Sequence, residues 1–334
     1  MTSQILNNGT VWKDTQGNPI HAHGGHMLYE NGWYYWYGED RGGKNYVNCY
    51  RSKDLMNWEF RNHVLTTESK TESTWNEADL TLVRDPNADY GERHILCIEG
   101  EDVYHKVNIE RPKVIYNKKT KKYVMWVHFE NGVNYDCARA GIATCDTPDG
   151  NFVYHGSFRP LGNMSRDCTL FQEEDGTAYF ISSSNDNADT HIYRLTEDYL
   201  GVEALINCLF LGEFREAPVV FKRAGRYYIL NSYCSGWDPN QCKYSTAEAI
   251  DGEWEELRNC ADDTTYHTQP AFVVKLFGKD QEEILYMGDR WSGGEYFSSS
   301  YVMLPLEFLK DNQIDFSYCA SFCIDIENGK YIRN

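Results

Sequence analysis

Five short strand-like runs recur along the chain, and they constrain its fold more than any other feature of the sequence. The runs are rich in β-branched and aromatic residues, and several follow a turn signal such as Asn-Gly, Asp-Gly or Ala-Gly. No segment has a convincing 3.6-residue periodicity. The sequence therefore predicts an all-β protein built on the runs 33–37, 123–127, 178–181, 227–230 and 284–287.

A second element follows each of the first four runs and turns these runs into a repeat. It consists of an acidic turn and then an aromatic or apolar residue, at 52–58, 149–152, 197–200 and 251–254. A repeat of about 50 residues is the spacing of a four-stranded propeller blade. We therefore predict a five-bladed β-propeller; a β-sandwich, whose strands recur every 8 to 12 residues or so, is the competing fold.

The domain organisation follows from this repeat. No linker or shift in composition divides the chain, so a single domain over 1–334 is expected. The first interval is nearly twice the others, which indicates an extended blade or an inserted loop over about 61–104. Segment 316–326 is expected to pair with the N-terminal segment and close the ring. The predicted blades are roughly 20–104, 105–160, 165–210, 214–258 and 267–317.

Composition excludes several classes of partner. The formal net charge of −18 argues against a nucleic acid or an anionic membrane surface. Apolar runs are too short to span a membrane. The 11 cysteines contain no Cys-x-x-Cys pair, which argues against a zinc site and a disulfide framework. No secretion signal is visible, so we expect reduced thiols and a cytoplasmic protein, or a secreted one if a leader was removed.

We expect the five runs to be the innermost strands of the blades. Polar residues precede each run, and in a propeller the starts of the innermost strands converge on one pocket. Three of the five positions carry a carboxylate: Glu110, Asp167 and Glu216. Hydrolysis of a glycosidic bond needs one group that protonates the leaving oxygen and a second that activates water. Neighbouring carboxylates raise the pKa of one member and suit it to be the acid. Ordinary ion pairs with the adjacent Arg residues are the alternative interpretation.

Two of these segments resemble glycoside hydrolase family 43, a family of inverting five-bladed propellers. They are Ser-Arg-Asp-Cys-Thr-Leu-Phe at 165–171 and Arg-Glu-Ala-Pro at 215–218. Segments 109–114 and 288–291 resemble its exo-β-1,3-galactanase branch. The resemblance covers nearly the whole chain. It implies an exo-acting enzyme that releases galactose from β-1,3-galactan or β-1,3-galacto-oligosaccharides.

The resemblance also implies catalytic roles. Glu216 would be the general acid, and Asp167 would orient it and raise its pKa. The aspartate that usually serves as base at the start of the first blade is missing, because 21–25 reads His-Ala-His-Gly-Gly. The branch pattern points to Gln269 as base through an imidic acid tautomer. Glu110 is the alternative, since an ionised carboxylate needs no rare tautomer.

Further residues are expected to bind the terminal sugar through hydrogen bonds and ring stacking. No metal or cofactor is predicted: His21, His23 and His26 lack partners at ligand spacing, so we expect them to line the channel, where a structural cation is left open. The candidate sugar-binding residues are Glu39, Asp40, Tyr135, Asn185, Asp289 and Arg290, with Trp291 or Trp237 for stacking.

The substrate partner expected is a galactose-containing oligo- or polysaccharide, and the sequence does not fix the oligomeric state. β-Xylosidase or α-L-arabinofuranosidase activity, common in the wider family, is the rival within the same class; the missing first-blade aspartate weighs against it. A catalytically inactive sugar-binding propeller is a rival from another class. A protein-interaction propeller is a third, although such proteins rarely place several carboxylates at the channel mouth.

Overall fold

The computed structural model describes residues 5–72, 96–99, 104–278 and 282–334. Over these residues the regular elements are β-strands and four 3₁₀ turns of three residues each, so the all-β prediction is confirmed. The same residues contain no helix that is long and apolar enough to cross a membrane. The 3₁₀ turns are η2 (Pro160–Gly162), η3 (Thr265–His267), η4 (Tyr296–Ser298) and η5 (Lys310–Asn312).

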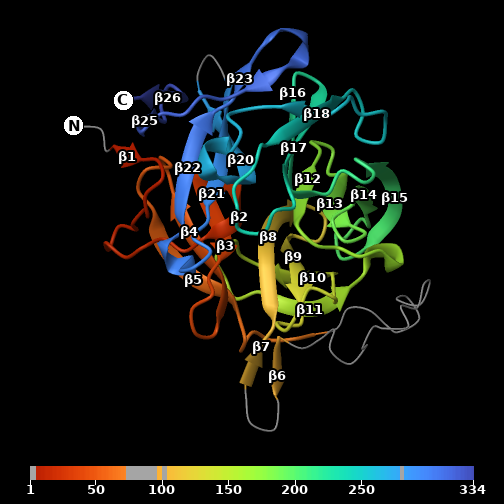
Figure 1. The fold of residues 1–334 in the computed structure, drawn as a ribbon. Coiled ribbons are helices and arrows are strands. Elements are labelled where there is room, and N and C mark those ends of the chain that lie inside the picture. The colour runs from red at the N-terminus through yellow and green to blue at the C-terminus, as the bar shows by residue number, and fades with distance from the viewer. Residues whose placement is uncertain (1–4, 73–95, 100–103, 279–281) are drawn as a thin grey trace.

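Five antiparallel sheets of three or four strands make up most of the molecule, and each is a consecutive stretch of chain (Figure 1). The first comprises β2 (His23–Glu30), β3 (Trp33–Glu39), β4 (Asn45–Ser52) and β5 (Glu59–Thr66). The second comprises β8 (Asn108–Asn117), β9 (Lys122–Glu130), β10 (Arg139–Cys145) and β11 (Val153–Phe158). The third comprises β12 (Cys168–Gln172), β13 (Ala178–Ser184), β14 (Asp189–Leu195) and β15 (Val202–Leu209). The fourth comprises β16 (Arg215–Arg223), β17 (Arg226–Tyr233), β18 (Lys243–Ala247) and β19 (Arg258–Asn259), and the fifth β20 (Gln269–Phe277), β21 (Glu282–Arg290) and β22 (Ser300–Pro305).

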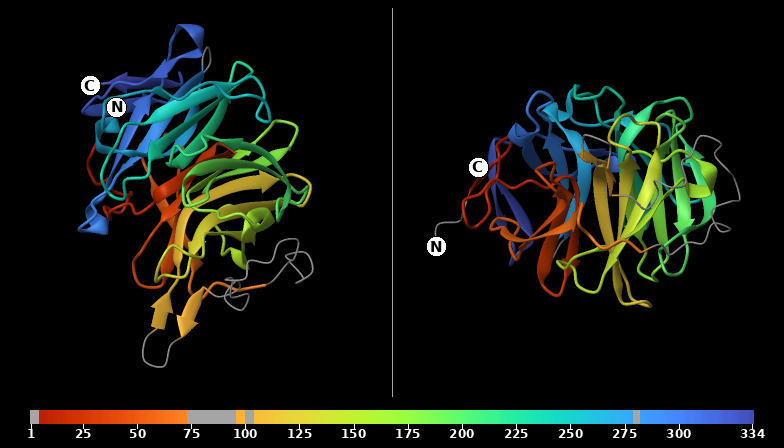
Figure 2. Two further views of the ribbon diagram at one scale, coloured as in Figure 1. Left: turned by 45° about the vertical axis from the view of Figure 1, so that its right-hand side comes forward. Right: turned by 90° about the horizontal axis from the view of Figure 1, so that it is seen from below.

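The first strands of the five sheets contact one another in a closed cycle. β2 contacts β8, β8 contacts β12, β12 contacts β16, β16 contacts β20, and β20 returns to β2. The sheets stand side by side around these strands (Figure 2). The start of each first strand therefore lies near the starts of the other four.

All five predicted runs are strands, but each is the second strand of its sheet. The expectation that they are the innermost strands is wrong, because the first strands contact one another. The first strands have the weaker sequence signal: they begin with polar residues, and β8, β16 and β20 are interrupted by proline. The predicted acidic turns of the first four sheets lie between the third and fourth strands.

Large aromatic side chains fill the space between neighbouring sheets. Trp36 of β3 is fully buried and packs on Trp58 and on Tyr301 of β22, which joins the first sheet to the fifth. Trp126 of β9 packs on Phe180 of β13 with ring centroids 4.5 Å apart, which joins the second sheet to the third. The many aromatics of the sequence thus serve largely as core between the sheets.

Both ends of the chain meet beside the fifth sheet. β1 (Leu6–Asn7) pairs with β25 (Ser321–Asp325), which pairs with β26 (Lys330–Arg333) (Figure 1). Thr10 forms an isolated bridge with Tyr301, which belongs to β22. The expected pairing of 316–326 with the N-terminal segment is therefore present.

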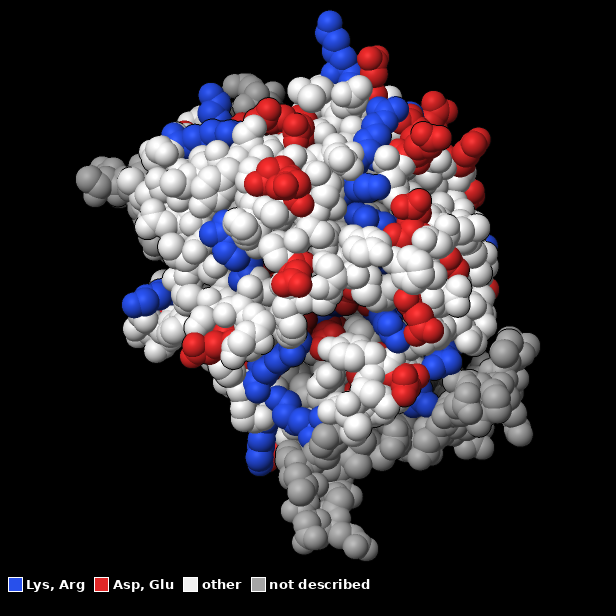
Figure 3. Space-filling view, viewed as in Figure 1, with Lys and Arg blue, Asp and Glu red and all other residues white. Residues whose placement is uncertain are grey.

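Two small hairpins complete the described chain. They are β6 (Cys97–Glu99) with β7 (Tyr104–Lys106) and β23 (Glu307–Phe308) with β24 (Ile314–Asp315). Most of the predicted extension of the first blade, 73–95 and 100–103, lies outside the described residues. Acidic and basic side chains are both spread over the face seen in Figure 3.

Candidate active site

A bulge recurs near the start of four of the five first strands and points polar side chains into one pocket. The strand register shifts after His23, Glu110 and Glu216 and after Pro270, next to Gln269. In the first three bulges the next residue, Gly24, Arg111 or Ala217, has a φ between 52° and 57°. Proline follows in Arg111-Pro112, Ala217-Pro218 and Gln269-Pro270, and proline is tolerated at bulges because it donates no ladder hydrogen bond.

These starts surround a pocket of about 360 Å³. All four predicted catalytic residues line it, so the structure brings together Glu216, Asp167, Glu110 and Gln269. Of the predicted sugar-binding residues, Glu39, Tyr135, Trp237 and Trp291 line it too.

Glu216 has the character of an acid that is protonated near neutral pH. Its Oε1 accepts a hydrogen bond from Gln269 Nε2 at 2.8 Å, and its Oε2 accepts one from Asn187 Nδ2 at 3.4 Å. Burial and the negative charge of Asp167 raise the pKa of Glu216 to about 7. At pH 7 about half of the Glu216 side chains would therefore carry a proton.

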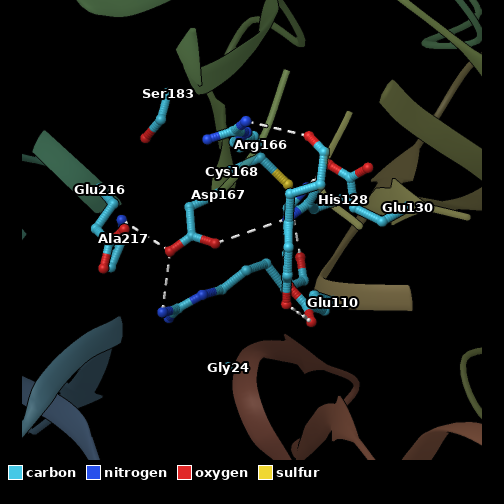
Figure 4. A network of polar contacts seen from close by, with 12 residues as sticks. Gly24, Glu110, His128, Glu130, Arg166, Asp167, Cys168, Ser183, Glu216 and Ala217 are labelled. Carbon is cyan, nitrogen blue, oxygen red and sulfur yellow. Dashed lines mark hydrogen bonds and ion pairs between the residues drawn. The ribbon is translucent and has the colours of Figure 1, made fainter. Parts of the chain in front are cut away.

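Asp167 is held ionised beside Glu216 (Figure 4). Its Oδ2 accepts a hydrogen bond from Ala217 N at 3.1 Å and forms an ion pair with Arg111 at 3.1 Å. Burial alone would raise the pKa of Asp167, but Arg111 and His128 outweigh it and hold the pKa well below its usual range. Because Asp167 binds the backbone next to Glu216 and carries a charge, it is placed to orient the acid and to raise its pKa.

The pKa of Glu110 shifts in the opposite direction to that of Glu216. Its Oε1 accepts hydrogen bonds from Tyr135 Oη at 2.8 Å and from Arg41 at 3.0 Å, and its Oε2 lies 3.4 Å from His128 Nδ1. Burial opposes ionisation, but the bond and charge of His128 and the charge of Arg41 outweigh it and lower the pKa of Glu110. Glu110 is therefore an ionised carboxylate.

Gln269 is fixed at both ends of its amide. Its Oε1 accepts from Arg111 and from Trp291 Nε1, the latter at 2.8 Å. Its Nε2 donates to Glu216 and to Ser232 Oγ at 3.1 Å. A side chain so restrained holds one orientation toward the acid.

Glu39 lies against Gly24, in the segment from which the first-blade aspartate is missing. A Cβ at Gly24 would collide with the Glu39 carboxylate. That carboxylate accepts hydrogen bonds from Arg111 N at 3.1 Å and from Arg41 at 3.2 Å. Burial raises the pKa of Glu39, so at a given pH a smaller fraction of it is ionised than of Glu110. Gly24 thus leaves room for a carboxylate from the next strand.

Four predicted sugar-binding residues lie outside this pocket. Asn185 is exposed and bonds to Asp189. The Asp289 carboxylate accepts from Gly24 N at 2.8 Å and contacts His23 Nδ1 at 2.9 Å, so it supports the first-blade bulge. Arg290 donates to Tyr266 O. Asp289 and Arg290 line a second cavity of about 210 Å³ that shares Trp237, Gln269 and Trp291 with the pocket. Asp40 bonds to Gly42, Asn45 and Asn48 within its own sheet.

The histidines predicted to line the channel make hydrogen bonds and ring contacts. His23 bonds to Asp289, and His26 Nδ1 accepts from Val114 N at 3.3 Å; burial lowers the pKa of His26 to about 3. His21 packs edge-on against Phe297. The buried Lys113 Nζ donates to Gly24 O and Gly25 O, both at 2.6 Å, and burial together with the charge of Arg111 lowers the pKa of Lys113 to about 7.

The described residues contain one group of three side chains with metal-ligating atoms close together, Glu110, His128 and Asp167, whose atoms lie within 4.8 Å of one another. His128 is buried between these carboxylates and Glu130, to which its Nε2 lies at 2.9 Å. Burial lowers the pKa of His128, but the three carboxylates outweigh it and raise the pKa well above its usual value. With its pKa raised in this way, His128 is a buried cation between the carboxylates.

Sequence reasoning missed several residues that line the pocket. Arg111 and Arg166 stand inside the motifs already described and could have been included with them. Arg41 follows Glu39 and Asp40 after the first run. His128, Asn187 and Cys234 lie at the ends of second strands or in the loops after them, where the sequence has no repeating signal.

Comparisons with known proteins agree with this site. The model of glycosyl hydrolases family 43 matches residues 112–271, and that of the glycosyl hydrolases family 32 N-terminal domain matches 25–154. No curated protein matches the chain. An exo-β-1,3-galactanase from Clostridium thermocellum is 43% identical, with a TM-score of 0.86, over 99% of this chain and 68% of that one.

Two further solved structures are similar. An exo-β-1,3-galactanase from Phanerochaete chrysosporium, determined with galactose, is 32% identical over 99% of this chain and 71% of that one, with a TM-score of 0.82. A family 43 β-1,3-galactosidase bound to galactodeoxynojirimycin is 31% identical over 94% of this chain and 99% of that one, with a TM-score of 0.80. On this identity and coverage, the chain belongs to glycoside hydrolase family 43, in its exo-β-1,3-galactanase branch.

Proposed function

We propose that the protein is an inverting, exo-acting glycoside hydrolase that releases galactose from the ends of β-1,3-galactan or β-1,3-galacto-oligosaccharides. The observation that carries this proposal is the pair of Glu216 and Asp167: one carboxyl has its pKa raised to about 7, and its ionised neighbour supplies part of the shift. The similar enzymes are exo-β-1,3-galactanases, and one was determined with β-1,3-galactotriose.

The fold in this proposal is a five-bladed β-propeller. The five consecutive sheets would be its blades, and the closed cycle of contacts among their first strands supports this arrangement. Propellers carry their sites where the innermost strands begin, next to the central channel. The pocket lies at the bulges near those starts, which agrees with a substrate site at one mouth of the channel.

Glu216 is the general acid of the proposed mechanism. As the bond between C1 of the terminal galactose and the glycosidic oxygen breaks, the Glu216 proton moves to that oxygen. A water molecule attacks C1 from the opposite face and gives its proton to a base, so the released galactose has inverted configuration. Asp167 stays ionised throughout and keeps the acid protonated until the transfer.

Two residues of the pocket, Gln269 and Glu110, are the candidates for the base. Gln269 donates directly to Glu216, whereas acid and base of inverting enzymes stand roughly 6.5–9.5 Å apart. The bond between Gln269 and Glu216 would therefore have to open when substrate and water enter. Glu110 is ionised in the free protein and needs no tautomer to accept a proton.

The terminal sugar would be held by directed hydrogen bonds and by an indole ring. Glu39 and Tyr135 present a carboxylate and a hydroxyl to the pocket, and Trp291 lines it beside Gln269. Trp237 is 46% exposed at the pocket rim, with Arg41 Cζ 5.6 Å from its ring centroid, and its exposed surface would stack on a sugar.

The experiment that tests the proposal is hydrolysis of β-1,3-galactobiose followed by proton NMR. The expected first product is α-galactose, which mutarotates later. Aryl β-galactoside, β-xyloside and α-L-arabinofuranoside are tested in parallel. Hydrolysis of the xyloside or arabinofuranoside alone would overturn the proposed substrate. Release of β-galactose as the first product would overturn the inverting mechanism. Binding without any product after long incubation would favour an inactive sugar-binding propeller.

Variants of the two base candidates separate them. Gln269→Ala and Glu110→Ala are assayed on an aryl β-galactoside with and without azide. A small anion that replaces the missing base attacks C1 and gives an α-galactosyl azide. We expect azide to restore turnover in one variant only, and that residue is the base.

A further inference from the structure

Glu216 has a second carboxylate oxygen whose contacts the proposed mechanism does not use. Asn187 Nδ2 lies 3.4 Å from Oε2 of Glu216 and 3.2 Å from the sulfur of Cys234. The Cys234 thiol accepts this amide hydrogen bond beside Glu216, and its interaction with the Glu216 carboxylate lowers the pKa of that group. Acid, amide and thiol thus form one cluster on the wall of the pocket.

The fold fixes the thiol relative to the acid. Cys234 N donates to Phe214 O at 3.0 Å, two residues before Glu216. β17 and β16 pair with Ser232 opposite Glu216, which leaves Cys234 just past the end of β17. Because the backbones of both segments are joined, the thiol approaches Glu216 without depending on a flexible loop.

The amide of Asn187 is buried and only half used by the protein. Asn187 is 6% exposed, and its Oδ1 is one of the buried polar atoms for which the described chain offers no hydrogen-bond partner. A buried acceptor without a partner is costly. Because Asn187 lines the pocket, a hydroxyl group of a bound sugar would be a suitable partner for Oδ1 after a small shift of the amide.

We infer that Cys234 and Asn187 are positioning residues for the general acid and that together they hold Oε2 of Glu216. When the proton leaves Glu216, the S–H group of Cys234 donates a hydrogen bond to the carboxylate that forms. This inference rests on the proposed role of Glu216. No bond to sulfur forms or breaks, and the thiol stays neutral in the cycle. Burial and the charge of Glu216 raise the pKa of the thiol, which keeps it an S–H donor at neutral pH.

The thiol has a measurable consequence for the acid. A donor to the ionised form lowers the pKa of a carboxyl group, and the bond to Cys234 opposes the upward shift caused by burial and by Asp167. We therefore expect Cys234→Ala to move the alkaline limb of kcat/KM upward by about half a pH unit, since S–H is a weak donor. Cys234→Ser, which keeps a donor, should restore the wild-type limb.

Asn187 gives a second, independent test of the same cluster. Asn187→Asp places a negative charge beside Glu216, so the alkaline limb should move upward by one pH unit or so. Asn187→Ala should lower kcat and raise KM, because it removes a contact to the acid and an acceptor for the sugar.

Cys208→Ala is the matched control for the thiol. Cys208 is an exposed free cysteine on β15 and does not line the pocket, so its replacement should leave the pH profile unchanged. Thermal unfolding of each variant shows whether the fold survives. A Cys234→Ala profile that coincides with that of the wild type overturns the inference.

The carboxyl carbon of Glu216, labelled with carbon-13, gives a readout that does not require turnover. Its NMR titration is assigned with Glu216→Gln and repeated in Cys234→Ala. An upward shift of the Glu216 pKa in the variant supports the inference, and an unchanged pKa overturns it. If the wild type releases no galactose, the proposed function fails, but this titration still decides the role of Cys234.

Discussion

The two sides of the pocket hold buried carboxylates whose pKa values shift in opposite directions. On the acid side, burial and the negative Asp167 outweigh the charge of Arg111, and the pKa of Glu216 rises to about 7. On the Glu110 side, His128 and Arg41 are cations, and the pKa of Glu110 falls although burial opposes this. The comparison teaches that the charge of the neighbours, and not burial itself, divides the roles in this site.

Arg111 and Asp167 contact residues on both sides of the pocket. Arg111 pairs with Asp167 and donates to Gln269, so it touches the acid side, while its backbone N donates to Glu39. Asp167 contacts both Ala217 next to the acid and, at 3.8 Å, His128. A change on one side should therefore be felt on the other, and the predictions below use this coupling.

The largest expected effect comes from removing the acid. Glu216→Gln keeps the size of the side chain but cannot donate the proton, so kcat/KM on β-1,3-galactobiose should fall by about 10²–10⁴. Hydrolysis of an aryl galactoside with a good leaving group should fall much less, because that oxygen needs no proton. Equal losses on both substrates would contradict the assignment, provided that thermal unfolding of the variant is unchanged.

Replacement of the buried cation should destabilise the protein. His128→Gln leaves the buried Glu130, Glu110 and Asp167 without their shared positive charge, and the free energy of unfolding should fall by about 3–5 kcal/mol. Urea unfolding followed by tryptophan fluorescence measures it. The control His267→Gln changes an exposed histidine and should stay within about 0.5 kcal/mol. An equal loss in both variants would show that the carboxylate cluster is not the cause.

The pH dependence of kcat/KM should reflect the ionisation of two carboxyl groups, Glu216 and Glu110. The acid must be protonated, and its pKa is raised to about 7, so activity should fall about tenfold per unit above that pH. If Glu110 is the base, it must be ionised, and its lowered pKa puts the acidic limb below the usual range for glutamate. An acidic limb that persists in Glu110→Gln would assign the base to another residue.

Replacement of Arg41 should change the pKa of Glu110, with a smaller effect on activity than the variants above. Arg41→Gln removes a positive charge from Glu110 and should raise its pKa, so the acidic limb should move upward by about half a pH unit for a cation 38% exposed. Arg51→Gln, which breaks an ion pair with Glu59 on β5 away from the pocket, is the control. A shift of the alkaline limb alone would indicate that Arg41 acts through Glu216 instead.

The sequence predicted the residues at the bulges better than those that follow the second strands. Glu110 and Glu216 precede a proline by two residues and Gln269 by one, and this pattern marks three of the four bulges. The order of the strands around the channel was predicted wrongly, because the aromatic second strands gave the clearer signal. His128 and Cys234 could not be predicted, because their roles depend on contacts with other sheets that no local pattern records.

The smallest expected effect separates two neighbouring asparagines. The sequence predicted Asn185 as a sugar-binding residue, but the structure turns it outward to Asp189, while Asn187, two residues on, is buried against Glu216. Asn185→Ala should therefore change kcat/KM by less than about twofold, as expected for an exposed side chain outside the pocket. Asn187→Ala should reduce it about tenfold, since a hydrogen bond to a carboxylate is worth roughly 1.5–3 kcal/mol and this one, at 3.4 Å, is long. If the two variants lose activity equally, the loop after β13 acts as a unit, and the contact of Asn187 with the acid is not what matters.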